Sequence, residues 1–186
     1  MLAPEMNKKL TETDTGTPGG TLMRRYWQPV ALSDELSGNR PVVPVRIFGE
    51  DLVLFRDGEG TLGLIDRHCP HRQADLCYGR LEANGLRCPF HGWLFDAEGT
   101  CLDQPGELPE NNRVRHFGQA AYPCVERNGM IFGYLGPGDP PPLPAIDSLV
   151  APDSQVFAFK GFLECNYLQA VEVGIDPAHA SFLHRY

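Results

Sequence analysis

Two short stretches of the sequence each pair a cysteine with a histidine. Cys69 and His71 are separated by one residue, and Cys88 and His91 are separated by two. Thiolates are soft, anionic ligands that suit iron–sulfur clusters and zinc, and imidazoles bind the same metals. Two of each at these spacings could close around one small inorganic centre. We therefore expect these four residues to hold either a [2Fe-2S] cluster whose second iron carries histidines, or a zinc ion.

The order of the four ligands distinguishes the two metals. Zinc fingers usually place two cysteines together and then two histidines, about a dozen residues further along the chain. Here each stretch carries one residue of each kind. Two imidazoles in place of two thiolates leave an iron–sulfur cluster less negative, so its reduction potential rises. The ligand order favours the iron–sulfur cluster over zinc.

At these positions the sequence resembles the Rieske family. The stretches Cys69-Pro70-His71-Arg72 and Cys88-Pro89-Phe90-His91-Gly92-Trp93 match the two cluster loops of that family. The resemblance implies that Cys69 and Cys88 hold one iron of a [2Fe-2S] cluster. It implies that His71 and His91 hold the other iron.

Residues of the second loop and the strand after it indicate which kind of Rieske protein this is. In the quinol-oxidising type, an extra cysteine in each loop forms a disulfide, and Ser and Tyr hydroxyls donate hydrogen bonds to sulfur. Here Phe90 stands at the cysteine position of the second loop, and Trp93 and Phe95 stand at the hydroxyl positions. Fewer donors to sulfur leave the reduced cluster less stabilised, so its potential falls. A low-potential centre suits the delivery of electrons to oxygen chemistry.

A second set of possible metal ligands lies near the C-terminus, at Asp176, His179 and His184. Two histidines and a carboxylate on one face of a ferrous iron leave positions open for O2 and substrate. Histidines five residues apart do not share the face of a regular helix. Pro177, however, indicates a helix start or a bend that could bring them together. Taken alone, two histidines at such a spacing are more often structural.

Downstream of the cluster loops, this set resembles the oxygenase component of Rieske non-haem iron oxygenases. The resemblance implies that His179 and His184 bind a mononuclear iron. It makes Asp176 a bridging aspartate, which links that iron site to a cluster histidine of a neighbouring subunit and implies a homo-oligomer, a trimer by resemblance. The family's third iron ligand is a carboxylate far downstream, so we expect this chain to be an N-terminal portion of a longer subunit. Residues 25–30 and 49–56 are similar to the phthalate 4,5-dioxygenase branch.

The function that this resemblance implies is an oxidation by O2 driven by electrons from a partner. An NAD(P)H-dependent reductase would supply electrons to the [2Fe-2S] cluster, and the cluster would pass them to the mononuclear iron. The iron would activate O2 against an aromatic, phthalate-like carboxylate. Two alternatives stay open at this point: an aromatic O-demethylase of the same family, and a Rieske ferredoxin, which carries electrons and has no substrate.

The composition limits the other classes of function. The formal net charge of -8 argues against binding to a nucleic-acid backbone. No apolar run approaches the roughly 20 residues of a membrane-spanning helix, and no secretory signal is visible, so we expect a cytoplasmic protein. In a reducing cytosol, two cysteines are expected to be metal ligands and the other four to be thiols without disulfides. Those four are Cys77, Cys101, Cys124 and Cys165.

The elements that must position the two loops are short strands. Runs at 42–48 and 52–56 flank Gly49-Glu50-Asp51, and Asn128-Gly129 is a strong signal for a two-residue hairpin. Strands and turns at this density predict a mainly β fold, an antiparallel β-sandwich, with both Cys/His stretches as loop tips on a rigid scaffold. We assign residues 41–136 to this Rieske [2Fe-2S] domain.

The segment before the sandwich is expected to be helical over residues 1–40. Pro4 can open a first short helix. Thr21 is a suitable N-cap for a second helix that ends at Tyr26, before Pro29.

The segment after the sandwich begins with a proline-rich linker over residues 137–154. Residues 155–186 would then begin an α+β catalytic domain that carries the mononuclear iron. Its first elements are predicted as a strand over residues 155–165 and a helix capped by Asn166 that runs to about Val173.

Overall fold

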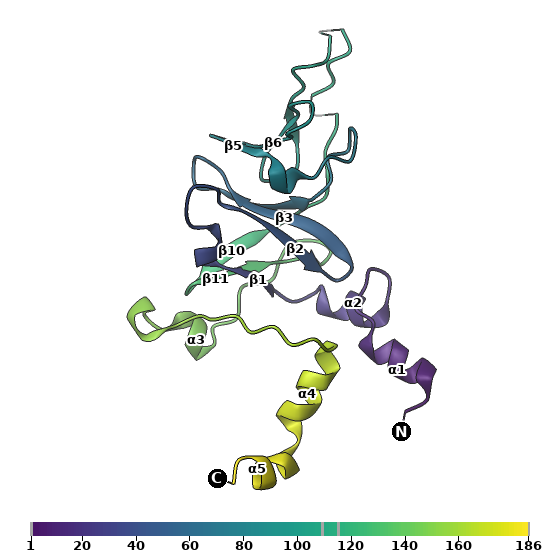
Figure 1. Cartoon of the computed structure of the whole chain (residues 1–186), viewed down its shortest axis with the longest axis vertical. Coiled ribbons are helices and arrows are strands. Elements are labelled where there is room, and N and C mark those ends of the chain that lie inside the picture. The colour runs from purple at the N-terminus through teal and green to yellow at the C-terminus, as the bar shows by residue number, and fades with distance from the viewer. Residues whose placement is uncertain (1, 109, 115, 186) are drawn as a thin grey trace.

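The computed structural model describes residues 2–108, 110–114 and 116–185, and the strands in these ranges form three antiparallel sheets (Figure 1). The first sheet is ordered β1-β11-β10, with β1 (Gln28–Leu32), β11 (Met130–Gly133) and β10 (Cys124–Arg127). The second is ordered β2-β3-β4-β9, with β2 (Val42–Ile47), β3 (Glu50–Arg56), β4 (Leu62–Asp66) and β9 (Ala121–Tyr122). The third is ordered β5-β6-β7-β8, with β5 (Arg80–Glu82), β6 (Gly85–Arg87), β7 (Leu94–Phe95) and β8 (Cys101–Asp103). The prediction of a mainly β, antiparallel fold is confirmed.

Two hairpins have two-residue turns with positive φ at both central residues. Phe48-Gly49 joins β2 to β3 with φ of 51° and 78°, and Asn128-Gly129 joins β10 to β11 with φ of 51° and 77°. Such turns match the right-handed twist of the strands that they connect. The Asn128-Gly129 prediction is confirmed. The first turn lies one residue earlier than the expected Gly49-Glu50-Asp51, because Glu50 already pairs with Ile47.

The central strand β3 is buried on both faces and separates two hydrophobic clusters. Val53 and Phe55 belong to one cluster, which also contains Cys69 and Cys88. Leu52 and Leu54, the alternate residues of β3, belong to the other cluster. That cluster also contains residues of β1, β2, β4 and β11. Because successive side chains of a strand point to opposite faces, β3 supports the layers on both sides. The two cysteines are therefore part of the core, which makes their backbone positions rigid.

The N-terminal segment contains two helices, α1 (Pro4–Thr11) and α2 (Pro18–Met23). The helix opened by Pro4 is confirmed. The second helix begins at Pro18 and not after Thr21, because Thr17 is the N-cap and its side chain accepts a hydrogen bond from the Gly20 N–H. The expected helical segment also contains β1, which pairs with β11 about one hundred residues away. Local sequence signals do not report such a distant partner.

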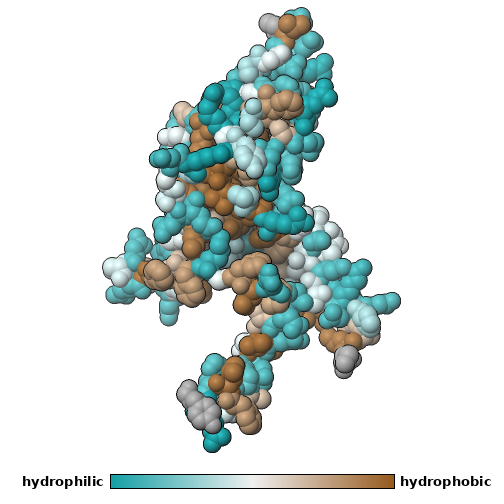
Figure 2. Space-filling view, in the orientation of Figure 1, coloured by the Kyte–Doolittle hydropathy of each residue, from teal (hydrophilic) through white to brown (hydrophobic). Residues whose placement is uncertain are grey.

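The C-terminal segment extends from the sheets as α3 (Asp147–Val150), α4 (Tyr167–Ile175) and α5 (Pro177–Leu183), with α5 furthest from the sheets (Figure 1). The helix capped by Asn166 is confirmed, since its side chain accepts a hydrogen bond from the Leu168 N–H. The strand predicted over residues 155–165 is not formed. A 3-10 turn, Asp153–Gln155, is followed by chain that pairs with no strand in the described part. Its apolar side chains point outward and contribute to the hydrophobic surface in Figure 2.

Candidate metal centre

The first Cys/His loop follows β4 and is closed by two backbone hydrogen bonds. The carbonyl oxygen of Cys69 accepts from the Gln73 N–H at 2.8 Å, and the Cys69 N–H donates to the carbonyl oxygen of Ala74 at 2.9 Å. Gln73 has a φ of 57°, which lets the chain turn back after four residues. His71 therefore lies at the tip of a tight loop whose base is a buried cysteine.

The second loop lies between β6 and β7 and repeats this pattern. The carbonyl oxygen of Cys88 accepts from the Gly92 N–H at 3.2 Å, and the Cys88 N–H donates to the carbonyl oxygen of Trp93 at 2.8 Å. Gly92 has a φ of 77° and takes the place that Gln73 has in the first loop. Two loops of the same design thus present one cysteine and one histidine each.

The two thiols lie together in the core, with 1% of Cys69 and 4% of Cys88 exposed. Burial raises the pKa of the Cys69 thiol to about 11, and the neighbouring Cys88 adds to the increase. The backbone amides of His71 and Arg72 face the Cys69 sulfur and oppose that shift, because they stabilise a thiolate. A buried thiol pair with amide donors aimed at it fits metal ligation, in which the metal displaces the protons.

The two imidazoles also converge. The ring centroids of His71 and His91 are 4.6 Å apart. The Nδ1 atom of His71 is buried and has no hydrogen-bond partner in the described part of the chain, whereas His91 is exposed. A buried ring nitrogen without a partner is unusual unless it binds something that is absent. This atom therefore fits a metal ligand.

The four residues supply the donor set of a two-iron cluster. A [2Fe-2S] cluster with mixed ligands needs two cysteines at one iron and two histidines at the other. The buried thiol pair and the facing imidazole pair supply that set.

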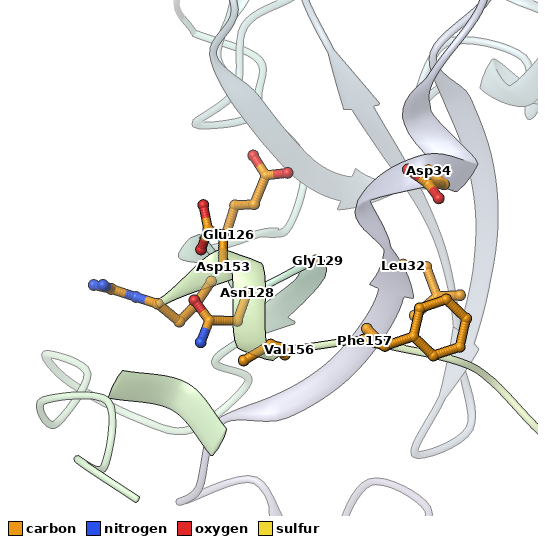
Figure 3. Close-up of a pocket in the computed structure, with 10 residues that line it drawn as sticks. Leu32, Asp34, Glu126, Asn128, Gly129, Asp153, Val156 and Phe157 are labelled. Atoms are coloured by element: carbon orange, nitrogen blue, oxygen red, sulfur yellow. The ribbon is translucent and has the colours of Figure 1, made fainter. Parts of the chain in front are cut away.

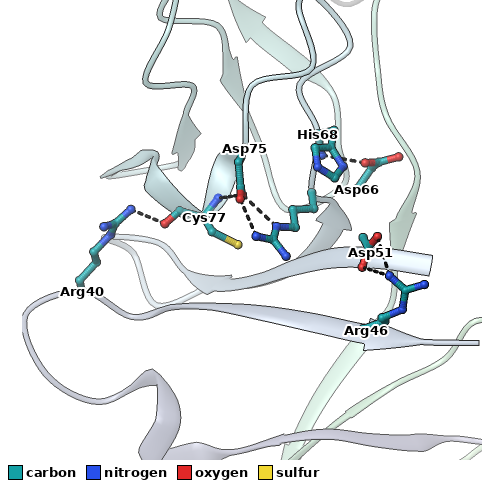
Figure 4. A network of polar contacts seen from close by, with 8 residues as sticks. Arg40, Arg46, Asp51, Asp66, His68, Asp75 and Cys77 are labelled. Atoms are coloured by element: carbon teal, nitrogen blue, oxygen red, sulfur yellow. Dashed lines mark hydrogen bonds and ion pairs between the residues drawn. The ribbon is translucent and has the colours of Figure 1, made fainter. Parts of the chain in front are cut away.

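An arginine–aspartate pair supports the first loop. Arg67 donates from Nε and Nη2 to the two carboxylate oxygens of Asp75, at 3.0 and 2.5 Å. Asp75 also accepts from the Cys77 N–H, and Arg40 donates to the carbonyl oxygen of Cys77 (Figure 4). The Arg67 guanidinium is the main cause that lowers the pKa of Asp75 to about 2. Bidentate hydrogen bonds between charged groups fix both the position and the orientation of the two side chains.

A second arginine supports the other loop. Arg87 donates to both carboxylate oxygens of Glu82, to Asp103 at 2.8 Å and to the carbonyl oxygen of Gly92. Arg87, followed by Arg80, lowers the pKa of Glu82 to about 2. Sequence reasoning missed both supports. The available signal was an arginine shortly before each cysteine, at positions 67 and 87.

All six cysteines are described, and all six are free thiols. Cys101 lies in the same hydrophobic cluster as Cys69 and Cys88, and Cys77 packs against that cluster. Burial raises the pKa of Cys77 to about 11, so this side chain is a neutral thiol at neutral pH.

The second set of expected residues lies where α4 ends and α5 begins, although within the described ranges its Asp and His side chains do not form a group of three that could hold one metal ion. Asp176 is the C-cap of α4 and the N-cap of α5, where its Oδ1 accepts from the Ala178 N–H at 2.8 Å. His184 follows the last residue of α5 and leaves the helical conformation. As a result the rings of His179 and His184 approach to 5.6 Å between centroids, although five residues separate them. The Nδ1 atom of His179 lies 3.7 Å from Oδ2 of Asp176.

The cluster loops and this histidine pair do not form one site within the chain. The strand β6, which leads into the second loop, lies near one end of the molecule, and α5 lies at the other end (Figure 1). The structure thus brings the predicted residues together in two separate groups.

A comparison with protein-family models decides the family. The model of the Rieske [2Fe-2S] domain matches residues 26–121, which include both loops. The chain belongs to this family. The Rieske domain match begins at Tyr26 and so includes β1, which lies in the segment that was predicted to be helical.

The Rieske chain is similar over nearly its whole length to oxygenase subunits. It is 43% identical to the 5,5'-dehydrodivanillate O-demethylase oxygenase subunit of a Sphingobium species, covering 99% of this chain and 44% of the relative. It is 40% identical to the phthalate 4,5-dioxygenase oxygenase subunit of Pseudomonas putida, covering 99% of this chain and 42% of the relative. The chain therefore spans less than half the length of these relatives.

Solved structures of oxygenases have a similar fold. The oxygenase–ferredoxin complex of carbazole 1,9a-dioxygenase matches with a TM-score of 0.68 and 29% identity, over 84% of this chain and 41% of that one. Dicamba monooxygenase with non-heme iron and dicamba matches with a TM-score of 0.58 and 32% identity, over 70% of this chain and 40% of that one.

A cavity of about 540 Å³ lies away from the cluster loops of the Rieske chain. It lies between the end of β1, the turn between β10 and β11, and the chain that follows the 3-10 turn at residues 153–155 (Figure 3). The carboxylates of Asp34, Glu126 and Asp153 are on its walls together with Phe157. These residues contribute to neither group of expected ligands. Among the helices of the described ranges, none combines the length and the apolar character that crossing a membrane requires.

Proposed function

We propose that this chain is the Rieske part, with the entry to the catalytic part, of the oxygenase component of a Rieske non-haem iron oxygenase. One observation carries the proposal: two loops of the same design bring a buried pair of thiols and a facing pair of imidazoles together. The similarity to oxygenase subunits over nearly the whole chain supports it.

In this proposal Cys69 and Cys88 hold one iron of a [2Fe-2S] cluster, and His71 and His91 hold the other. When bound, such a cluster supplies one-electron transfer. The chain supplies two rigid ligand loops. Arg67 supports the first loop and Arg87 supports the second. The chain also supplies backbone amides that favour the thiolate form of Cys69. The exposed ring of His91 gives an electron-transfer partner access to the outer iron.

The proposed second site uses His179 and His184 as two ligands of a mononuclear ferrous iron, whose third ligand would be a carboxylate. When bound, that iron supplies the site at which O2 and substrate meet. Asp176 would link a histidine of this site to a cluster histidine of a neighbouring subunit. The separation of the two groups within one chain supports a link between subunits, and hence a homo-oligomer.

The proposed partner is a reductase or ferredoxin that draws on NAD(P)H, and the proposed substrate is an aromatic compound that carries a carboxylate. The ferredoxin complex of a similar oxygenase supports the first statement. Two relatives support the second, one a phthalate dioxygenase and the other an O-demethylase. Ring dihydroxylation and O-demethylation are both compatible with the residues described here. A cytoplasmic location is part of the same proposal.

The cluster is tested on the purified chain by iron and sulfide analysis and by electron paramagnetic resonance after reduction. We expect two irons and two sulfides per chain and the spectrum of a cluster with histidine ligands. Cys88→Ser should lose the cluster, while Cys124→Ser, which changes a cysteine outside both loops, should keep it. Zinc without visible absorbance would contradict the proposal.

The catalytic role is tested in an oxygenase subunit that contains this chain. Asp176→Asn should leave the cluster reducible by the donor but slow the O2-dependent oxidation of aromatic carboxylates. The control is Asp153→Asn, which changes a carboxylate away from both groups of ligands. Reduction with no oxidation of any aromatic substrate in the unmodified subunit would instead favour the alternative function, an electron carrier of the ferredoxin type.

A further inference from the structure

Trp93 lies directly against one of the two cluster histidines. Its indole ring is stacked on the ring of His71, with 4.8 Å between centroids and 6° between planes. An offset parallel arrangement of two aromatic rings is a favourable contact, and it restricts rotation of the smaller ring. Trp93 therefore limits the directions in which the Nδ1 atom of His71 can point.

Trp93 is itself held in place. It is 5% exposed and packs against Phe95 at 6.4 Å and Phe117 at 5.2 Å between centroids. Its carbonyl oxygen accepts the hydrogen bond from the Cys88 N–H that closes the second loop. The ring that supports the first-loop histidine thus belongs to the residue that closes the second loop, so the two loops are joined at this contact.

His91 has different surroundings. Its ring lies beside Phe90, at 3.9 Å between centroids but tilted by 35°, and Phe90 is 63% exposed. A side chain that is mostly in solvent keeps much of its rotational freedom and gives little support to a neighbouring ring. The two histidines are therefore inequivalent, since the ring of His71 lies against a buried side chain and the ring of His91 lies against an exposed one.

We propose that Trp93 is a positioning residue for the cluster: its indole fixes the plane of the His71 ring, while His91 is left free to adjust. This inference rests on the proposed assignment of the four cluster ligands. Trp93 does not touch the metal in this proposal, and it acts only through His71. Residues that orient a metal ligand in this way typically change metal affinity by about 10- to 100-fold when they are replaced.

The test compares Trp93→Leu with Trp93→Phe and with Phe90→Leu in the purified, cluster-loaded chain. In Trp93→Leu we expect about tenfold faster loss of iron to a chelator. We also expect broadened resonance lines of the reduced cluster and a changed reduction potential. Trp93→Phe keeps a flat ring against His71 and should restore most of the unmodified behaviour. Phe90→Leu changes the aromatic neighbour of His91 and should change the spectrum and the potential much less than Trp93→Leu does.

Three outcomes would overturn the inference. In the first, Trp93→Leu has the spectrum and the rate of iron release of the unmodified chain. In the second, Phe90→Leu changes both as much as Trp93→Leu does. In the third, Trp93→Phe behaves like Trp93→Leu. If Trp93→Leu does not fold, Phe117→Leu removes one ring that supports the indole, at a residue that is 42% exposed. It should then broaden the same lines to a smaller extent, and an unchanged spectrum overturns the inference. Absence of a histidine-ligated cluster in the unmodified chain would instead refute the proposed function.

Discussion

At the scale of single residues, the two cluster loops differ at one equivalent position. Gln73 and Gly92 both donate the N–H that closes their loop, and both have positive φ. A residue with a side chain pays roughly 1–2 kcal/mol in this conformation, whereas glycine loses roughly 0.5–1 kcal/mol more chain entropy on folding. Gln73→Gly should therefore stabilise the chain by about 0.5–1 kcal/mol, measured as a higher urea midpoint.

The reverse change in the other loop is the matched control. Gly92 has a φ of 77°, and an added Cβ would lie 2.9 Å from Cγ of Pro105. Gly92→Ala should therefore lower the urea midpoint and weaken cluster retention. A destabilising Gln73→Gly would show that the weak contact from Nε2 of Gln73 to the Cys69 carbonyl oxygen, at 3.5 Å, matters more than backbone strain.

Asp75 should make the stability of the chain depend on pH. Arg67 lowers its folded-state pKa from 3.8 to about 2. Because a depressed carboxyl pKa stabilises the fold only where the group is ionised, this contribution is complete above about pH 5. It declines as the pH falls through 3.8 and is lost near pH 2. Asp75→Asn should cost about 2 kcal/mol at pH 7 and progressively less in acid.

The measurement is urea unfolding of Asp75→Asn and the unmodified chain at a series of pH values. A difference between the two curves that stays constant from pH 7 to the acid limit would show that packing, and not the charge pair, accounts for the role of Asp75.

The ligand residues could be predicted from the sequence because their types and order are chemical properties of the chain itself. Their supports could not be predicted in the same way. Arg67 reaches Asp75 only because the chain folds back after the loop, and Trp93 meets His71 only because two separate loops are brought together. Each of these contacts is set by the fold and not by spacing in the sequence.

At the scale of elements, the chain over residues 156–163 pairs with no strand in the described part and buries little apolar surface. Its three phenylalanines, Phe157, Phe159 and Phe162, are 86%, 78% and 86% exposed. Replacing all three by alanine should change the free energy of unfolding by less than about 0.5 kcal/mol, because they bury little surface. The same change should reduce self-association, since exposed aromatic side chains promote it. Calorimetry and light scattering measure the two effects.

Phe132 supplies the control for that triple variant. It is 7% exposed in β11, so Phe132→Ala should cost roughly 3–5 kcal/mol. A large loss of stability in the triple variant would show that this segment packs against the sheets in solution.

The elements that were predicted correctly have signals within a few residues. The Asn128-Gly129 turn, the Pro4 helix start and the Asn166 cap are of this kind. The errors concern pairing over long distances. β1 needs β11 as its partner, and residues 155–165 have the composition of a strand but no partner strand in the described part of the chain. Strand propensity reflects packing on neighbours, so composition alone cannot supply it.

At the scale of the whole molecule, the two groups of expected ligands lie at opposite ends (Figure 1). His179 and His184 are on or beside α5, which extends from the sheets and has no buried residue. The cluster ligands are supported by the core around β3. The two groups share no hydrogen bond or ring contact in the described ranges, and changes at well-separated sites usually have independent effects.

The double variant His179→Ala, His184→Ala should therefore leave cluster content, resonance spectrum and reduction potential unchanged in the dilute, monomeric chain. Asp176→Asn should behave in the same way. If Asp176 links neighbouring subunits as proposed, the reduction potential should respond to both variants only at concentrations where the protein associates. Titration of the potential against protein concentration measures this. A response at every dilution would mean that the two ends communicate within one chain, and the link between subunits would then be unnecessary.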